Sequence, residues 1–324
     1  MKHYQKAHPC LVSILLIALS GMAIAQSPNM VLTDNKTENP KKAIFVFKDI
    51  ENFAISMKAI ASGMDSTQAL QTLYFDQATP GLRMFMDKYD LNTKRMINAL
   101  KKHSEVYARI PKNLEILKSQ ENKFKQTYAK IKRIIPNAVF PPTYFLVAGH
   151  RGIGSGSIEG PLISIEKKTP QSIRGDLTAT LVHEMVHMEQ LAAVGDAYFD
   201  IFSGEERTLL ATSIREGGAT FITQLITGGS KHKNLAWDYF LSHEKELWQK
   251  FSNEMYGNEM GDWLWSKPAN SDWPQDLGYA IGARIIENYY NNAPDKPKAA
   301  MQIMAITDYP AFLKLSGYGS NFDE

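Results

Sequence analysis

Apolar positions recur every three or four residues through the first half of the chain. One such series consists of Ile50, Phe53, Ala54, Met57 and Ile60. This spacing places the apolar side chains on one face of an α-helix. Pro80 and Pro111 interrupt the pattern and divide the region into several helices. We therefore expect a helical N-terminal region over residues 43–135, preceded by a polar, flexible leader over residues 26–42.

The pattern changes after Pro136. Two segments rich in β-forming residues, 143–148 and 158–166, flank a glycine-rich segment at residues 149–157. This order predicts a strand, a loop and a second strand. A phosphate-binding loop would need a following Lys-Ser/Thr pair and a helix that starts directly after the glycines, and the chain has neither. We interpret the segment as a flexible hairpin that borders a cleft.

Helical spacing returns in the second half. Asp176 is a candidate N-cap for a helix that ends near Gly195, and a second helix is expected from about Thr208 to Thr227. A third helix is expected after Asp276. The predicted fold class is α+β and predominantly α-helical, with a small sheet before the helix that ends at Gly195 and a helical C-terminal part.

The length and composition allow a sizeable core. The chain has 324 residues, of which 44% are hydrophobic, enough for one large domain or two small ones. We expect the N-terminal helical region to be followed by a second region over residues 136–324, or the two to form one continuous domain over residues 43–324.

Residues 1–25 have the form of a secretory signal peptide. Lys2 and Lys6 precede an apolar run over residues 11–19, and Ala23-Ile24-Ala25 is a small-x-small cleavage signal. The run is shorter than the ~20 residues that span a bilayer, which argues against an uncleaved anchor. We expect cleavage after Ala25, a secreted or periplasmic protein, and no stable membrane insertion afterwards.

Charge and cysteine usage of the mature chain follow from that cleavage. Removing the two lysines of the signal from the 36 basic residues leaves 34, equal to the 34 acidic residues. The balance gives no reason to expect nucleic acid as a partner, and the sequence leaves the oligomeric state open. The one cysteine, Cys10, leaves with the signal, so disulfides do not stabilise the exported chain.

The sequence His183-Glu184-Met185-Val186-His187 carries the clearest chemistry. On a helix, residues four apart project from one face, so the two imidazoles are able to share one Zn²⁺ ion while Glu184 lies beside them. The alternative is a pair of structural histidines with a solvated Glu184. The metzincin pattern is excluded because Gln190 and Ala193 stand where it needs Gly and His.

A catalytic zinc site needs a third protein ligand and an open fourth position. Glu216 is the favoured ligand because it falls in the next expected helix. Gly217 and Gly218 would let that helix approach closely, and Thr220, one turn later, would contact a ligand histidine. In the other interpretation the glycines simply break the helix. The remaining candidate ligands are His232, Glu189, Asp196, Asp200, Glu205 and Glu206.

These residues carry a family resemblance. His183-Glu184-x-x-His187 followed by Glu216-Gly217-Gly218-Ala219 resembles the gluzincin metalloproteases. The chain is more closely similar to a bacterial family known as predicted Zn-dependent proteases. The further matching features are the glycine-rich strand-loop-strand, Leu277-Gly278-Tyr279-x-Ile281-Gly282, and Phe312-Leu313-x-x-Ser316-Gly317-Tyr318. Thr220 stands where the thermolysin-like pattern has Asp.

The resemblance implies a zincin-like fold and a zinc metallopeptidase that hydrolyses peptide bonds of a peptide or protein substrate. One Zn²⁺ per chain on His183, His187 and Glu216 would activate a water, and Glu184 would act as general base. Tyr279 is the candidate oxyanion donor, ahead of His150 and Arg284. The strand at residues 162–166 is a candidate to pair with an extended peptide. The alternative function is a non-catalytic exported module that binds peptide or cell-wall fragments.

Overall fold

The computed structural model describes residues 31–201, 207–228, 235–269, 272–320 and 322. The fold is predominantly helical with one small mixed sheet, as expected for the α+β class. The expected signal segment, residues 1–25, lies outside the described residues. No helix in the described ranges is long and apolar enough to cross a membrane.

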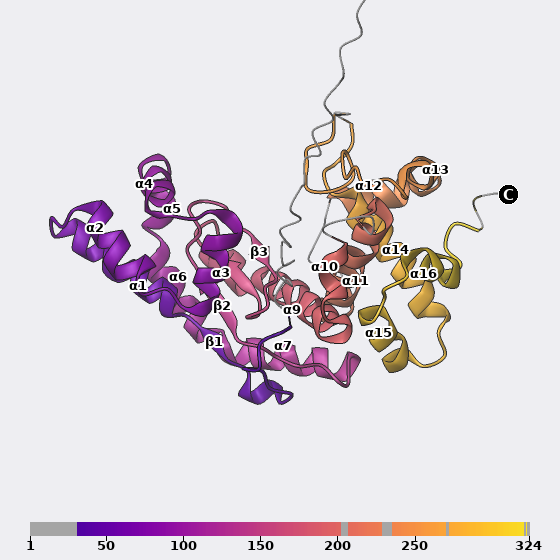
Figure 1. Cartoon of the computed structure of the whole chain (residues 1–324), viewed down its shortest axis with the longest axis horizontal. Coiled ribbons are helices and arrows are strands. Elements are labelled where there is room, and N and C mark those ends of the chain that lie inside the picture. The colour runs from indigo at the N-terminus through magenta and orange to yellow at the C-terminus, as the bar shows by residue number, and fades with distance from the viewer. Residues whose placement is uncertain (1–30, 202–206, 229–234, 270–271, 321, 323–324) are drawn as a thin grey trace, which may run out of the picture.

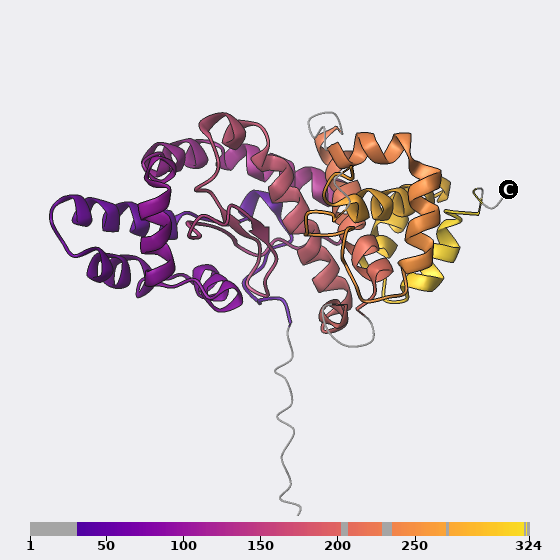
Figure 2. The same cartoon turned by 90° about the horizontal axis from the view of Figure 1, so that it is seen from above.

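Most of the N-terminal helices form one end of the elongated molecule, whereas the last of them, Glu121–Ile134, runs along its middle (Figures 1 and 2). Helix α3 shows how the sequence starts them: the Thr79 side chain accepts a hydrogen bond from the Leu82 N–H, and Pro80 stands in the first turn, where no N–H is needed. The elements are α1 (Lys48–Ala61), α2 (Ser66–Leu70), a π-helical turn (Gln71–Phe75), α3 (Pro80–Tyr89), α4 (Thr93–Lys102), α5 (Ser104–Tyr107), α6 (Ile110–Ser119) and α7 (Glu121–Ile134).

Part of the expected flexible leader is anchored. The Thr33 N–H donates to the carbonyl of Ile158, and Thr37 forms a bridge with Phe140. The side chain of Leu32 is buried in the core. A 3₁₀ turn follows at Pro40–Lys42. Residues 31–42 therefore pack as part of the fold, because one apolar side chain and several backbone hydrogen bonds hold them.

The sheet joins both halves of the chain. Its strands are β1 (Phe45–Val46), β2 (Thr143–Leu146), β3 (Gly154–Ser155) and β4 (Leu162–Ser164), in the order β1-β2-β4-β3. β1, β2 and β4 are parallel, whereas β3 is antiparallel to β4. Because β4 has a neighbour on each side, the expectation that residues 162–166 pair with a peptide is wrong. The edge strand beside β4 is β3.

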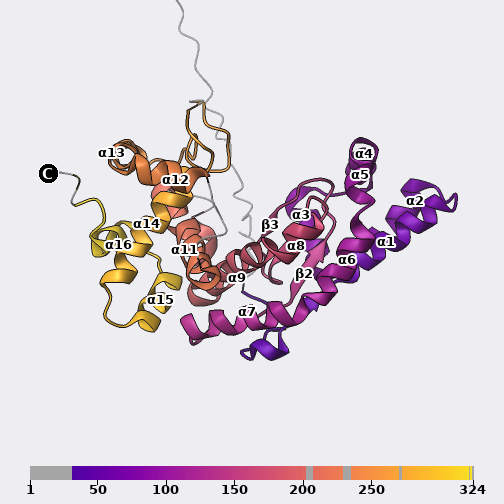
Figure 3. The same ribbon diagram turned by 180° about the vertical axis from the view of Figure 1, so that it is seen from behind.

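The C-terminal helices form the other end of the molecule, with α9 between the two ends (Figures 1 and 3). Gly195 ends α9 with a positive φ of 58°, as a glycine can. The elements are α8 (Pro170–Arg174), α9 (Leu177–Val194), α10 (Ala197–Asp200), α11 (Leu209–Thr227), α12 (Leu235–Ser242), α13 (Glu244–Glu254), α14 (Leu277–Asn292), α15 (Lys296–Met304) and α16 (Tyr309–Ser316).

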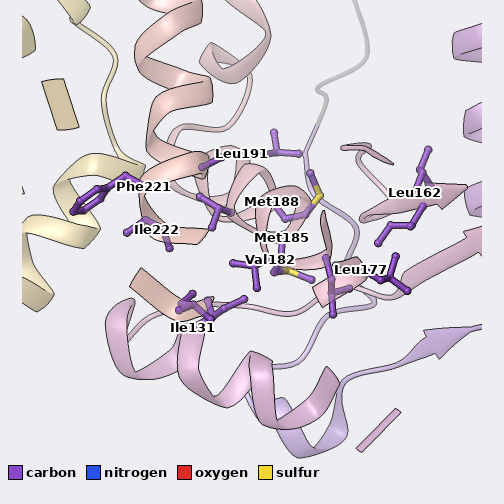
Figure 4. Packing of buried hydrophobic residues seen from close by; sticks show 14 of the residues in the cluster. Ile131, Leu162, Leu177, Val182, Met185, Met188, Leu191, Phe221 and Ile222 are labelled. Carbon is purple, nitrogen blue, oxygen red and sulfur yellow. The ribbon is translucent and has the colours of Figure 1, made fainter. Parts of the chain in front are cut away.

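Helix α9 is buried around most of its circumference. Figure 4 shows Val182 and Met185 between Ile131 of α7 and Ile222 of α11, and Leu177 beside Leu162 of β4. All six of these side chains are fully buried. A helix with apolar contacts on several sides has little freedom to shift, so its polar side chains are held in fixed positions.

Candidate metal centre

Helix α9 brings its two histidines together. His183 and His187 lie one turn apart, and their Nε2 atoms are 3.2 Å from each other. The planes of the two rings stand at 87° to one another. His187 is buried, whereas His183 is half-buried beside a cavity.

Helix α11 supplies the third side chain. Glu216 Oε2 lies 3.2 Å from His183 Nε2 and 3.2 Å from His187 Nε2. Tetrahedral zinc with ligand distances of about 2.0 Å separates its ligand atoms by roughly 3.3 Å. The three atoms therefore have the spacing of three corners of a zinc tetrahedron, and together they form a group able to hold a metal ion.

The other candidate ligands do not join this group. The Glu189 carboxylate lies on another side of α9, where it accepts a hydrogen bond from the Val139 N–H at 3.0 Å. Asp196 and Asp200 are not part of the cluster. His232, Glu205 and Glu206 lie outside the described residues.

The hydrogen bonds of Gln190 indicate which nitrogen of His187 is free to bind a metal. Gln190 Nε2 donates to the carbonyl of Arg215 at 3.0 Å, which leaves Gln190 Oε1 as an acceptor for His187 Nδ1 at 2.8 Å. Neutral His187 then carries its proton on Nδ1 and its lone pair on Nε2. That lone pair faces the carboxylate oxygen of Glu216, so either a proton or a metal ion between the two atoms is needed to make the arrangement favourable.

The carboxylate of Glu216 is suited to be the anionic ligand. Burial acts to raise its pKa, but the charges and hydrogen bonds of His187 and His183 outweigh burial and hold the pKa well below its usual range. The group is therefore ionised at neutral pH. An ionised oxygen together with two imidazole nitrogens is a donor set that zinc prefers.

The expected role of Thr220 is wrong. Within the part of the chain that the structure describes, Thr220 forms no hydrogen bond with either histidine; it lines the cavity instead. Gln190 takes the expected role of orienting a histidine. The signal for this was present in the sequence, since Gln190 lies three residues after His187 and so on the same helix face.

Gly217 and Gly218 do not break α11, which continues through them to Thr227. A Cβ atom on Gly217 would overlap the backbone of Gly282 in α14, and one on Gly282 would overlap the carbonyl oxygen of Ser213. A Cβ on Gly218 would press on the side chain of Gln190. The small residues therefore let α11 approach α14 and α9, which places Glu216 against the histidines.

Arg215, the residue before Glu216, fixes this turn of α11 through contacts with α10 and α16. Its guanidinium donates to the carbonyl of Tyr198 and to the hydroxyl of Tyr309, and it lies 4.1 Å from the centroid of the Tyr198 ring. The ring of Tyr198 in turn contacts the edge of His187. No local pattern in the sequence indicates this role of Arg215, because its partners come from α10 and α16.

Glu184 lies beside the cluster of His183, His187 and Glu216 but is not one of its three members. A Cβ on Gly154 of β3 would overlap Glu184 Oε1, so the carboxylate sits directly against the edge strand. Burial raises its pKa to about 7; the charge of His183 lowers it and that of Glu216 raises it further. A carboxylate with a pKa near neutrality is well matched to accepting and releasing a proton.

A cavity of about 360 Å³ opens beside the cluster of possible metal ligands, at His183. His183 and Glu184 form one part of its wall, and Tyr279 forms another. Its full lining consists of Ala179, Thr180, His183, Glu184, Thr220, Thr223, Gln224, Trp237, Asp276, Tyr279 and Ala280. The cavity gives a ligand direct access to the side of the cluster on which Glu184 lies.

Tyr279 is held in this cavity by Trp265. The Tyr279 ring centroid is 6.0 Å from that of His183. The Tyr279 hydroxyl oxygen accepts a hydrogen bond from Trp265 Nε1–H at 3.0 Å, and the Trp265 backbone N–H donates to the Asp276 carboxylate at 2.8 Å. Because its oxygen is already an acceptor, the hydroxyl is free to donate its own proton to a ligand.

The two weaker candidates for an oxyanion donor lie elsewhere. His150 stacks on His103 with ring centroids 3.5 Å apart. Arg284 is bound by the carboxylates of Glu244 and Glu287. Neither lines the cavity beside His183, so both expectations are wrong. His150 belongs to the loop between β2 and β3, and Arg284 pairs with Glu244 of α13.

Comparison with known proteins supports the chemistry that the geometry suggests. A family model described as predicted Zn-dependent protease (DUF2268) matches residues 115–307. The matched range contains α9, α11 and α14 and therefore every residue of the cluster and its cavity. Comparisons with curated proteins and with solved structures gave no match. Because the family model covers more than half of the chain, the protein belongs to this family of predicted Zn-dependent proteases.

Proposed function

We propose that the chain is an exported metallopeptidase that binds one Zn²⁺ through His183, His187 and Glu216 and hydrolyses peptide bonds. The observation that carries the proposal is the convergence of these three ligand atoms beside Glu184 at an open cavity. The signal-like residues 1–25 are the reason to place the reaction outside the cytosol. The family of the chain agrees with zinc-dependent proteolysis.

The roles of the side chains follow from their positions. A zinc ion in this donor set supplies Lewis-acid activation of water and of a scissile carbonyl. Glu184 faces the cavity with a pKa near neutrality, so it accepts the proton of the attacking water and passes it to the leaving amine. Gln190 keeps the proton of His187 on Nδ1, which leaves Nε2 available as a ligand.

Strand β3 is the proposed support for an extended substrate. It is the edge strand that lies against Glu184, and an edge strand can pair with a peptide through backbone hydrogen bonds. Gly154 leaves no side chain between the strand and the carboxylate. A substrate paired there would place its backbone beside the general base.

The test of the proposal combines metal analysis with a peptide-cleavage screen. The purified chain is expected to contain about one zinc per molecule and to cleave peptides. Removal of zinc with a chelator is expected to abolish cleavage, and added zinc to restore it. A folded chain that neither holds zinc nor cleaves when zinc is supplied would contradict the proposal and favour the non-catalytic module.

Tyr279→Phe is expected to lower kcat by about 10²-fold, with little change in KM or zinc content. The variant removes the hydroxyl that is free to donate to a developing oxyanion, and losing one such donor costs about 10²–10³-fold in rate. Steady-state kinetics on a cleaved peptide measures the effect. Tyr290→Phe is the matched control, because Tyr290 is on the same helix and outside the cavity. An unchanged kcat in Tyr279→Phe would remove Tyr279 from the mechanism.

A further inference from the structure

A second cavity, of about 380 Å³, is lined by the start of the glycine-rich loop, whose Gly154 lies against Glu184. It is formed by the end of α3, by α4 and by the loop that follows β2. We call it the basic pocket. Its lining consists of Tyr89, Leu91, Arg95, Asn98, Ala99, Lys102, His103, Ala148, Gly149, His150 and Arg151. Three of these residues are Lys or Arg, two are His, and none is acidic.

Two of the cations have no anionic partner among the described residues. Lys102 forms no ion pair or hydrogen bond with any residue that the structure describes. The Arg151 guanidinium lies 4.7 Å from the centroid of the Tyr89 ring and makes one long hydrogen bond, of 3.5 Å, to the Tyr89 carbonyl. Arg95, in contrast, is paired with Asp90 at 2.7 Å. The pocket therefore contains two uncompensated positive charges with free N–H groups.

The surroundings of the two histidines of the basic pocket support a positive electrostatic potential inside it. His103 and His150 are stacked with ring planes 6° apart, and the buried Nδ1 of His150 has no hydrogen-bond partner in the described structure. Burial lowers the pKa of His150, and the positive charges of Lys167 and His103 lower it further, while the charge of Glu105 acts to raise it. A cavity lined by one sign of charge concentrates ions of the opposite sign.

The basic pocket is connected to the metal centre through strand β3. Tyr89 lines the pocket, and its hydroxyl donates to Ser155 Oγ of β3 at 2.9 Å. Arg151 precedes Gly154, the glycine against Glu184, by three residues. Three residues of extended chain span at most about 11 Å. A peptide that pairs with β3 beside Glu184 would therefore reach the pocket within about three or four residues.

We propose that the basic pocket binds an Asp or Glu side chain of the peptide substrate, three or four residues from the bond that is cleaved. This inference rests on the proposed function. The Lys102 ammonium and the Arg151 guanidinium would donate charge-assisted hydrogen bonds to the substrate carboxylate. Asn98 adds an uncharged amide at the pocket wall. The pocket thereby selects acidic substrates without touching the reacting bond.

The test uses a series of paired, labelled peptides. The two peptides of each pair differ only in having Glu or Gln at one position near the cleaved bond, and this position changes from pair to pair. Binding is measured by fluorescence anisotropy on the zinc-loaded Glu184→Gln chain, which is expected to bind without cleaving. We expect the Glu peptide with the correct spacing to bind about three- to tenfold more tightly than its Gln counterpart. Adding Lys102→Ala and Arg151→Ala should bring this ratio close to one, and high salt should do the same.

Lys94→Ala with Lys101→Ala is the matched control, since it removes two positive charges from α4 outside the basic pocket. The control pair should keep the Glu-to-Gln ratio. An unchanged ratio in the Lys102 and Arg151 pair, or an equal fall in both pairs, would overturn the proposal. So would inorganic phosphate that binds in the pocket while the two peptides bind equally, because the pocket would then be a small-anion site.

The two proposals fail in different ways. If the parent chain cleaves no peptide, the proposed function fails, whereas the binding ratio of Glu and Gln peptides that are varied at every position still reports on the basic pocket. If the parent chain cleaves Glu and Gln peptides with equal kcat/KM at every position, the pocket proposal fails and the peptidase proposal stands.

Discussion

Glu184→Gln is expected to lower peptide hydrolysis by about 10²–10⁴-fold while the chain keeps its fold and its zinc. The amide has nearly the shape of the carboxylate but is unable to accept the proton of the attacking water. The ligand atoms belong to His183, His187 and Glu216, so the substitution removes no ligand. The measurements are kcat/KM on a cleaved peptide, zinc content per chain, and thermal unfolding.

Glu189→Gln is the control for this change, because it makes the same substitution on the same helix. Burial raises the pKa of Glu189 to about 8, so the group is largely neutral at pH 7. The Gln carbonyl is able to keep the hydrogen bond from the Val139 N–H. We expect near-parental activity in this variant. If Glu184→Gln cleaved as fast as the parent, Glu184 would not be the general base.

Gly282→Ala is expected to destabilise the protein by about 3 kcal/mol or more and to weaken zinc binding. The added methyl group would overlap the carbonyl oxygen of Ser213 in α11. Backbone atoms are unable to rotate away as a side chain can, so α11 and α14 must separate, and overpacking of this kind costs about 1–3 kcal/mol or more. The gain in helix propensity, about 1 kcal/mol, is too small to offset it.

Loss of zinc affinity is expected in the same variant because Glu216 lies three residues after Ser213 on α11. A shift of α11 moves its carboxylate away from the histidines of α9. Urea unfolding measures the stability, and titration with zinc measures the affinity. Gly175→Ala is the control, since Gly175 has a negative φ and the nearest atom to its added Cβ would be 3.5 Å away. A stable Gly282→Ala with parental zinc affinity would contradict the close packing.

The spacing of apolar and β-forming residues along the chain predicted much of the fold. The apolar periodicity indicated helices in both halves, and the β-rich segments around the glycines indicated the small sheet. Gly195 was recognised as the end of α9 because a glycine readily adopts a positive φ. The strand order was not predictable, since β1 and β2 are separated by almost 100 residues and their pairing depends on the whole core. For that reason the sequence placed the expected peptide-binding edge on β4, whereas the edge strand of the structure is β3.

The site, like the fold, was predictable from the sequence only in part. The sequence by itself determined that His183, Glu184 and His187 share one helical turn, because the period of the α-helix places residues four apart on one face. Only the tertiary structure decided that Gln190 is held by the carbonyl of Arg215, that Gly217 packs on α14, and that α4 and the glycine-rich loop enclose a basic pocket. Each of these depends on contacts between elements whose separation along the chain carries no geometric information. Close packing of the complete core is what brings them to fixed distances.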